Sequence, residues 1–265
     1  MKLVRYGAAG SEKPGLIDAS GQLRDLSGQI GDLAGDAFSP AGLAKLAALD
    51  AAKLPAVSGS PRLGSPVGGS PKFIAIGLNF ADHAAESNLP IPTEPIVFMK
   101  ANNALCGPND DVEKPRGSTK LDWEVELAVV IGTRAKYVSE ADALKYVAGY
   151  AVCNDVSERN FQIERGGNWT KGKSHDTFGP LGPWLVTADE VGDVQKLDMW
   201  LDVNGQRRQT GSTATMIFNV AQIVSYLSGM MTLMPGDVIT TGTPPGVGMG
   251  MKPQPQFLNA GDVMT

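Results

Sequence analysis

The chain has 265 residues, 42% of them hydrophobic and 19% charged, which suffices for one large domain or for a domain with an appendage. The 23 Lys and Arg and the 28 Asp and Glu give a net charge of -5, and no block of like charge occurs. This argues against nucleic acid as a partner. The longest apolar stretches, such as 127–131, are far shorter than the roughly 20 residues of a membrane-spanning helix, and no export signal opens the chain. We therefore expect a cytoplasmic protein that makes no membrane contact.

The two cysteines, Cys106 and Cys153, do not have the spacing of a metal site. One disulfide is possible, but two reduced thiols are the better interpretation for a cytosolic chain. The 32 Gly and 18 Pro exceed average usage and stay below the level of low-complexity disorder. Together they predict a turn-rich fold of short strands.

The first 54 residues read as a small α/β domain. Short strands are expected at 3–6 and 15–18, and Ser39 followed by Pro40 is typical of a helix start. From 55 to 71 the chain is dominated by Ser, Gly and Pro without apolar periodicity, as in a linker. We therefore place a domain boundary there, with the main body at 72–265.

Strands outnumber helices in this body. Asn204-Gly205 predicts a tight hairpin between 200–203 and 206–209, because this pair readily takes the positive φ angles that the turn requires. The other elements expected are strands at 73–77, 96–99, 121–131, 147–152 and 238–241, helical segments at 81–87 and 139–146, and a helix at 218–227 that ends at Gly229. The fold class is therefore mainly β, of the α+β type.

Two glutamates lie two positions apart in the strand expected at 121–131. Alternating side chains point to opposite faces of a strand, so Glu124 and Glu126 share a face. An isolated pair of this kind is more often a solvated acidic face, but the apolar run 127–131 indicates a strand buried on both sides. Buried carboxylates repel each other unless a cation lies between them. Asp122 shares this face, and we expect it to be solvated at the start of the strand.

A third carboxylate, Asp155, follows the strand expected at 147–152. Three carboxylates, with water or a chelating substrate at the remaining positions, are typical of an octahedral Mg²⁺ or Mn²⁺ site. Zinc is disfavoured because the chain has 2 His and no Cys pair. We therefore expect one Mg²⁺ or Mn²⁺ ion.

The candidate general base is His83, three residues before Glu86. On a helical turn this spacing puts both side chains on one face, so the carboxylate can orient the imidazole. An isolated pair of this kind is more often a surface ion pair, but this one follows the strand at 73–77, where active-site loops commonly begin. His175, the only other histidine, is expected to be structural or to support the site from behind.

Five motifs occur in order over residues 70–250: Gly77-Leu-Asn-Phe-x-x-His-x-x-Glu, Asp122-Trp-Glu-Val-Glu-Leu, Asn154-Asp-Val-Ser, Lys173-Ser-x-Asp-Thr-Phe-Gly-Pro and Pro235-Gly-Asp-Val-Ile-x-Thr-Gly-Thr-Pro-x-Gly-Val. Together they resemble the fumarylacetoacetate hydrolase family. The resemblance implies a mixed β-roll with a small N-terminal domain, a homodimer, and one Mg²⁺ or Mn²⁺ held by Glu124, Glu126 and Asp155.

The resemblance also implies roles for other residues. His83 would be the base and Glu86 its partner, on a segment that orders over bound substrate, and Lys173 would support catalysis. Three further positions, Arg159, Gln162 and Thr243, would line the pocket of a 2-oxo acid substrate. The chain departs from the family pattern at Phe80, where many relatives have Tyr, at His175, where many have Phe or a small residue, and at Glu158-Arg-Asn, where Ala-Arg-Asp is frequent. Relatives usually continue past 261–265, so we expect a truncated sequence.

The family includes C–C hydrolases, hydratases, decarboxylases, isomerases and lyases, so membership alone does not define the reaction. The stretch from Glu158 to Ser174 most resembles the branch that hydrolyses 2,4-dioxo-3-deoxy sugar acids, which is also labelled ureidoglycolate lyase. We favour a metal-dependent hydrolase that cleaves a C–C bond of a 2,4-dioxo acid and releases pyruvate and a second carboxylic acid. The lyase, and a binding module without catalysis, stay open as alternatives.

Overall fold

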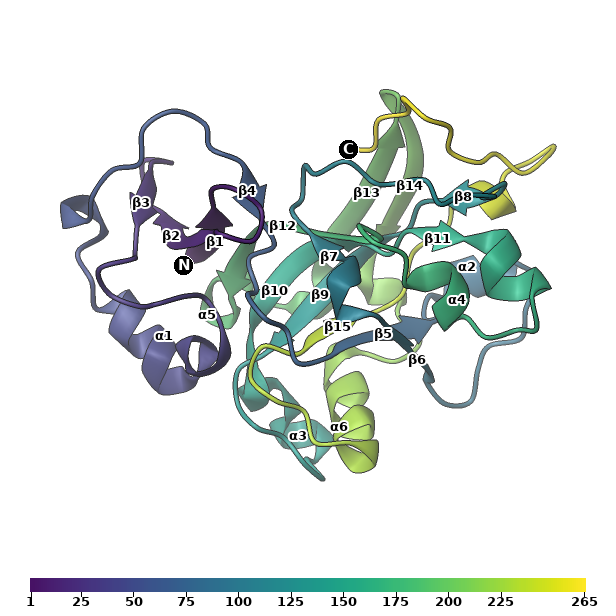
Figure 1. The fold of residues 1–265 in the computed structure, drawn as a ribbon. Helices are drawn as coiled ribbons and strands as arrows, with labels where there is room; N and C mark the ends of the chain where they lie inside the picture. The colour runs from purple at the N-terminus through teal and green to yellow at the C-terminus, as the bar shows by residue number, and fades with distance from the viewer.

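One large β-sheet runs through the computed structural model, which describes residues 1–265 (Figure 1). Its strands are β1 (Lys2–Tyr6), β2 (Lys13–Ile17), β3 (Leu23–Asp25), β4 (Leu63–Gly64), β5 (Phe73–Gly77), β6 (Ile96–Lys100), β7 (Leu105–Cys106), β9 (Val125–Ile131), β10 (Val147–Asn154), β12 (Gly179–Thr187) and β15 (Val238–Thr240). The main path has the order β3-β2-β1-β12-β10-β9-β15-β5-β6, with β4 paired to β1 and β7 to β12. The expected mainly β, α+β fold is confirmed.

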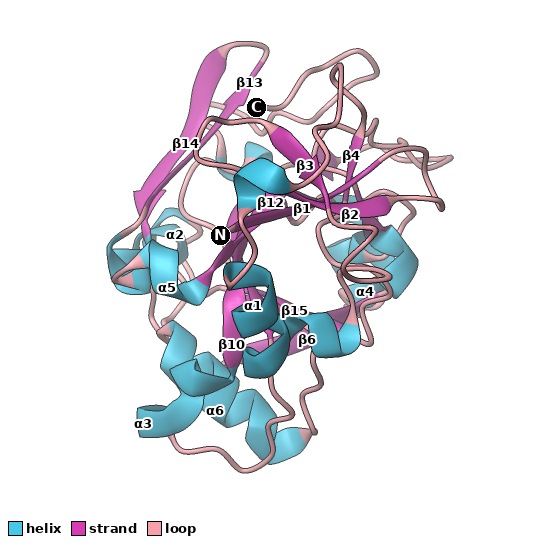
Figure 2. Ribbon diagram, turned by 90° about the vertical axis from the view of Figure 1, so that its left-hand side faces the viewer, coloured by secondary structure: helices cyan, strands magenta, loops and turns pink.

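Smaller elements surround this sheet. They are the paired strands β8 (Leu121–Asp122) and β11 (Ser157–Glu158), the hairpin β13 (Asp198–Val203) and β14 (Gln206–Ser212), and the helices α1 (Pro40–Ala47), α2 (Ala81–Glu86), α3 (Glu140–Ala143), α4 (Thr170–Lys173), α5 (Ala188–Val191) and α6 (Val220–Met230). Figure 2, seen from the N-terminal side, shows α3 and α6 together at the foot of the molecule. No helix combines the length and apolarity needed to cross a membrane.

The centre of the sheet is buried on both faces. Every residue of β9 is buried, and β9 pairs antiparallel with β10 on one side and with β15 on the other. The apolar run 127–131 follows from this position, because neither face of the strand meets water. The centre of the sheet is thus a rigid, dry support for the side chains at the ends of β9 and β10.

Two local predictions for the body had different outcomes. The hairpin is confirmed: Asn204 and Gly205 have φ angles of 53° and 72°, as a type I′ turn requires. The predicted end of the last helix at Gly229 was wrong, because α6 continues to Met230 and ends where Met231 becomes extended. A glycine inside a helix can continue it without taking a positive φ, so its presence alone does not mark an end.

The N-terminal residues extend the same sheet. β1 pairs antiparallel with β12, with Leu3 opposite Leu185, so the purple strands of Figure 1 continue the sheet of the body. The segment 55–71 includes β4 and buries Ser65 and Val67, and a surface linker was therefore the wrong description of it. Its Gly and Pro residues mark turns of a packed segment. The division into a small domain at 1–54 and a main body at 72–265 stays a prediction.

Candidate active site

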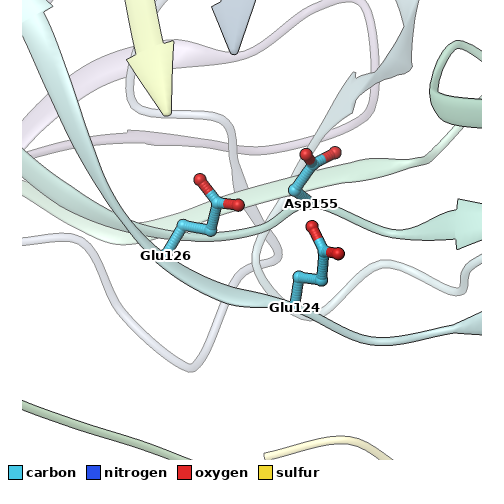
Figure 3. A group of neighbouring side chains, drawn as sticks. All are labelled: Glu124, Glu126 and Asp155. Atoms are coloured by element: carbon cyan, nitrogen blue, oxygen red, sulfur yellow. The ribbon is translucent and has the colours of Figure 1, made fainter. Parts of the chain in front are cut away.

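Three buried carboxylates meet at the ends of β9 and β10. Glu124 precedes β9, Glu126 lies within it, and Asp155 directly follows β10. One ligand atom from each side chain lies within 4.8 Å of those of the other two, and Figure 3 shows the three carboxylates directed into the same space. Their exposures are only 6%, 2% and 1%. The structure thus brings together the three residues predicted as metal ligands.

The backbone is interrupted just before β9. The strand predicted at 121–131 is in fact two, β8 and β9, because side-chain amides replace strand partners at the break. The N–H of Glu124 donates to Oδ1 of Asn154 at 3.0 Å, and the N–H of Val125 donates to Oε1 of Gln209 at 2.8 Å. The prediction of one continuous strand was therefore wrong. Side-chain alternation survives the break, so Glu124 and Glu126 still share a face.

The charges around these carboxylates are unequal. Burial, followed by the charges of Asp155 and Glu124, raises the pKa of Glu126 well above its usual value. Burial also acts to raise the pKa of Glu124, but Lys173 and Arg159 outweigh it and lower this pKa to about 2. A cluster of oxygen donors that repel one another in a dry setting fits a hard divalent ion such as Mg²⁺ or Mn²⁺.

A buried lysine connects two of the carboxylates. Nζ of Lys173 lies 2.6 Å from Oε2 of Glu124 and 2.8 Å from Oδ2 of Asp155. Burial acts to lower the pKa of Lys173, but the charges of Asp155 and Glu124 dominate and raise it. Lys173 is therefore a fixed ammonium group beside the carboxylates, where it can stabilise negative charge on a bound anion.

A second buried lysine, Lys100, was not foreseen. Its Nζ lies 2.5 Å from Oδ1 of Asp155 and 2.5 Å from the carbonyl oxygen of Lys173, and burial lowers its pKa. The available signal was its place at the end of the apolar strand β6, where a lysine must either reach solvent or find an acceptor. Lys100 therefore fixes the orientation of Asp155 from the side opposite Lys173.

The histidine and glutamate of α2 form the predicted pair. Nδ1 of His83 lies 3.1 Å from Oε2 of Glu86, and the N–H of Gly246 donates to both oxygens of Glu86 at 3.0 and 3.2 Å. Burial acts to raise the pKa of Glu86, but the hydrogen bonds from His83 and Gly246 lower it overall. Since Nδ1 faces this carboxylate, Nε2 is the ring nitrogen left for water or substrate. The loop 242–246, which contains Gly246, also reaches the triad, because its Gly242 N–H donates to Oε2 of Glu126 at 2.7 Å.

The other predicted residues also lie around the carboxylates, and each has a polar group that is bonded within the protein. Nη2 of Arg159 lies 2.7 Å from Oε1 of Glu124, and its Nη1 donates to Oε1 of Gln162 at 3.0 Å. The hydroxyl of Thr243 donates its proton to the carbonyl oxygen of Val125 at 2.8 Å. That hydroxyl can only accept a hydrogen bond from a ligand. Direct contact of these three residues with substrate stays a prediction.

Asp122 is the clearest departure from expectation. It is fully buried, and its Oδ2 accepts a hydrogen bond from Nε of Arg159 at 2.8 Å. The prediction that it is solvated was wrong, because the guanidinium and three backbone N–H groups replace water around it. The chain thus has a fourth buried carboxylate next to the predicted metal ligands.

The remaining histidine and the cysteines lie outside this hydrogen-bonded group. The ring of His175 lies 5.3 Å from that of Phe161 and 5.1 Å from that of Phe178, and burial lowers its pKa. This packing agrees with a structural role. Cys106 and Cys153 are both free thiols, as expected.

A dry carboxylate cluster close to a histidine–glutamate pair is a candidate active site, and comparison with known proteins identifies the family of the chain. Residues 72–265 match the family described as fumarylacetoacetate (FAA) hydrolase, C-terminal. A relative from Burkholderia ambifaria, which bears only the general name of hydrolase, is 65% identical over 264 residues, covering 100% of this chain and 94% of the relative. The chain belongs to the fumarylacetoacetate hydrolase family.

Solved structures agree with this assignment. Fumarylacetoacetate hydrolase from Exiguobacterium antarcticum is 35% identical with a TM-score of 0.85, and the match covers 100% of this chain and 94% of that one. Maleylpyruvate hydrolase from Sphingobium, solved with manganese(II) and pyruvate, is 29% identical with a TM-score of 0.80, covering 100% and 93%. An isomerase of 2-hydroxyhepta-2,4-diene-1,7-dioate from Mycobacterium marinum is 31% identical with a TM-score of 0.76, covering 100% and 92%. The chain is thus an enzyme of a family with hydrolases and isomerases.

Proposed function

We propose that this enzyme is a divalent-metal-dependent hydrolase that cleaves the C3–C4 bond of a 2,4-dioxo acid and releases pyruvate and a second carboxylic acid. The observation that carries the proposal is that one loop, 242–246, holds both groups: its N–H groups donate to Glu86 of the His83–Glu86 pair and to Glu126 of the triad of Glu124, Glu126 and Asp155. A carboxylate triad with a positioned base suits the addition of water to a carbonyl group that the same site holds.

The triad is the proposed binding site for one Mg²⁺ or Mn²⁺ ion. When bound there, the ion would hold the carboxylate and 2-oxo groups of the substrate and polarise them. Lys100 and Lys173 keep Asp155 in place from two sides, because each donates to a different oxygen of its carboxylate. Donor oxygens held in this way lose little freedom when a ligand binds.

His83 is the proposed general base. Its Nε2 accepts a proton from a water molecule whose oxygen attacks the C4 carbonyl carbon. The imidazolium that forms is stabilised by Glu86, which is a carboxylate because its pKa is lowered. Glu86 also holds the ring orientation through the bond to Nδ1. The two residues therefore act as one unit in proton transfer.

Lys173 is the proposed stabiliser of the leaving fragment. As the C3–C4 bond breaks, its electron pair passes into the three-carbon fragment, and negative charge develops on the 2-oxo oxygen. The buried ammonium of Lys173 lies among the groups that hold this end of the substrate, where a fixed positive charge is most effective. A proton delivered to C3 completes pyruvate, while the hydroxyl from water remains on the acyl carbon of the second acid.

The test is a product analysis. The protein with Mg²⁺ or Mn²⁺ is mixed with a series of 2,4-dioxo acids, and pyruvate is followed by coupling to lactate dehydrogenase, with mass spectrometry of the second product. We expect pyruvate and the matching carboxylic acid in equal amounts, and loss of both with EDTA. Isomerisation of a dienoate without C–C cleavage would contradict the proposal. So would glyoxylate release from ureidoglycolate when no dioxo acid reacts.

A further inference from the structure

Asp122 accepts four hydrogen bonds in a fully buried position. Its Oδ1 accepts from the N–H of Trp123 at 2.8 Å and of Gly248 at 2.6 Å. Its Oδ2 accepts from Nε of Arg159 at 2.8 Å and from the N–H of Met249 at 3.0 Å. An ionised carboxylate offers about four acceptor positions, so all of them are used. The carboxylate of an aspartate satisfies all four donors. The amide of an asparagine would direct its own N–H groups at the two donors that face one of the oxygens.

On one side, Asp122 is connected to the predicted metal ligands through Arg159. Arg159 contacts both Asp122 and Glu124, with its Nη2 at 2.7 Å from Oε1 of Glu124. Burial acts to lower the pKa of Arg159, but these two carboxylates raise it above its usual value. The guanidinium is therefore shared. Asp122 holds it at a position where only part of its charge is directed at Glu124.

On the other side, Asp122 is connected to the proposed base through the segment 246–250. The segment 246–250 is held between Asp122, which binds its Gly248 and Met249 N–H groups, and Glu86, which accepts from its Gly246 N–H. The approach is close: a Cβ on Gly248 would lie 2.7 Å from Oδ1 of Asp122. Moving this segment would therefore move the donor that orients Glu86.

We propose that Asp122 is a positioning residue that couples the His83–Glu86 pair to the metal ligand Glu124. It does so through two contacts, Arg159 on one side and the segment 246–250 on the other. Asp122 itself does not touch substrate. This inference rests on the proposed function, which assigns the roles of base and metal ligand. It adds that the position of these two groups relative to each other depends on one buried aspartate.

The first test is the substitution Asp122→Asn, measured as Mn²⁺ affinity by calorimetric titration of the full chain. We expect affinity to fall about tenfold, the usual effect of losing a residue that supports a metal ligand. Arg159 loses its other carboxylate partner and is left with Glu124 as its only one, and one negative charge leaves the surroundings, so both changes oppose cation binding. If Asp122→Asn does not fold, Asp122→Ser removes the same charge with a smaller side chain, and the same result is expected.

A matched control is available in Asp237→Asn. Asp237 is also fully buried and accepts from a backbone N–H, that of Met234, at 2.7 Å and from a cation, Nζ of Lys72, at 2.6 Å. It is part of a turn before β15 and contacts none of the site residues. We expect Mn²⁺ affinity and turnover to stay unchanged in this variant, whatever its thermal stability.

The second test is a double-mutant cycle for turnover with Glu86→Gln. If Asp122 acts through Glu86, Asp122→Asn should lower kcat about tenfold in the parent and clearly less in the Glu86→Gln background. Glu86→Gln alone should leave Mn²⁺ affinity unchanged. Additive losses in kcat, or a loss of thermal stability with kcat and Mn²⁺ affinity unchanged, would overturn the coupling. Mn²⁺ titration needs no substrate. It therefore tests the effect of Asp122 on Glu124 even if no 2,4-dioxo acid reacts and the proposed function fails.

Discussion

Turnover should fall about 10²–10⁴-fold in His83→Ala, the usual range for removal of a general base. The two carboxylates of α2 are engaged, Glu86 by His83 and by the N–H of Gly246, and Asp82 by the N–H of His83 and the hydroxyl of Thr215, which leaves the imidazole to take a proton from water. Mn²⁺ affinity should stay nearly the same, because the carboxylates of the triad lie on other elements. Glu86→Gln should lower turnover in the same direction but less, since the imidazole remains.

Three measurements check this result. They are kcat from pyruvate release at saturating Mn²⁺, Mn²⁺ affinity by calorimetry, and thermal stability. The control is His175→Ala, which removes the other histidine from its packing against Phe161 and Phe178 and should affect stability more than turnover. An active His83→Ala together with an inactive His175→Ala would transfer the role of base to His175.

Mn²⁺ binding should be abolished in Glu126→Gln, with the fold intact. The amide keeps the shape of the side chain and can still accept from the N–H of Gly242, a bond of 2.7 Å in the parent. It loses the negative charge that a hard divalent ion requires from its ligands. Without added metal the variant should melt at a higher temperature than the parent, because burial and the charges of Asp155 and Glu124 oppose ionisation of Glu126.

The pH dependence follows from the sign of this shift. A carboxyl whose pKa is raised by folding holds a proton that the unfolded chain releases, so it lowers stability as pH rises above the ordinary glutamate range. The difference in melting temperature between Glu126→Gln and the parent, measured with EDTA, should therefore shrink as pH falls through the raised pKa of Glu126. Glu113→Gln, an exposed carboxylate, is the control. Unchanged Mn²⁺ affinity in Glu126→Gln would contradict the assignment of this ligand.

The clustering of the three carboxylates could be predicted because their pattern is local. Glu124 and Glu126 are two positions apart beside an apolar run, and Asp155 comes where the neighbouring strand ends. Period-two alternation survives a break in the strand, so the shared face was predicted although the break was not. The break itself depends on Gln209, whose side-chain oxygen accepts the hydrogen bond from the N–H of Val125. The two residues are 84 positions apart in the sequence. No local pattern indicates such a partner.

The buried charges around the triad were harder to predict. Asp122 is separated by 37 residues from Arg159 and by 126 from Gly248, and Lys100 by 55 from Asp155. Whether an aspartate at a strand start is solvated depends on what packs over it, and that is a property of the complete fold. Residue type and spacing therefore indicate which groups carry the chemistry, while their supporting partners require the structure.

The proposed base and the metal ligands differ in how firmly the fold holds their backbones. The amides of β9 are bonded between β10 and β15, whereas α2 has six residues and is followed by the largely exposed segment 88–94. Amide hydrogen exchange in β9 therefore requires opening of the whole sheet, while α2 exchanges through local opening. Any ligand that contacts His83 slows exchange in α2 and leaves β9 unchanged. A peptide covering residues 81–94 is thus a direct reporter of site occupancy, even for compounds that the enzyme does not convert.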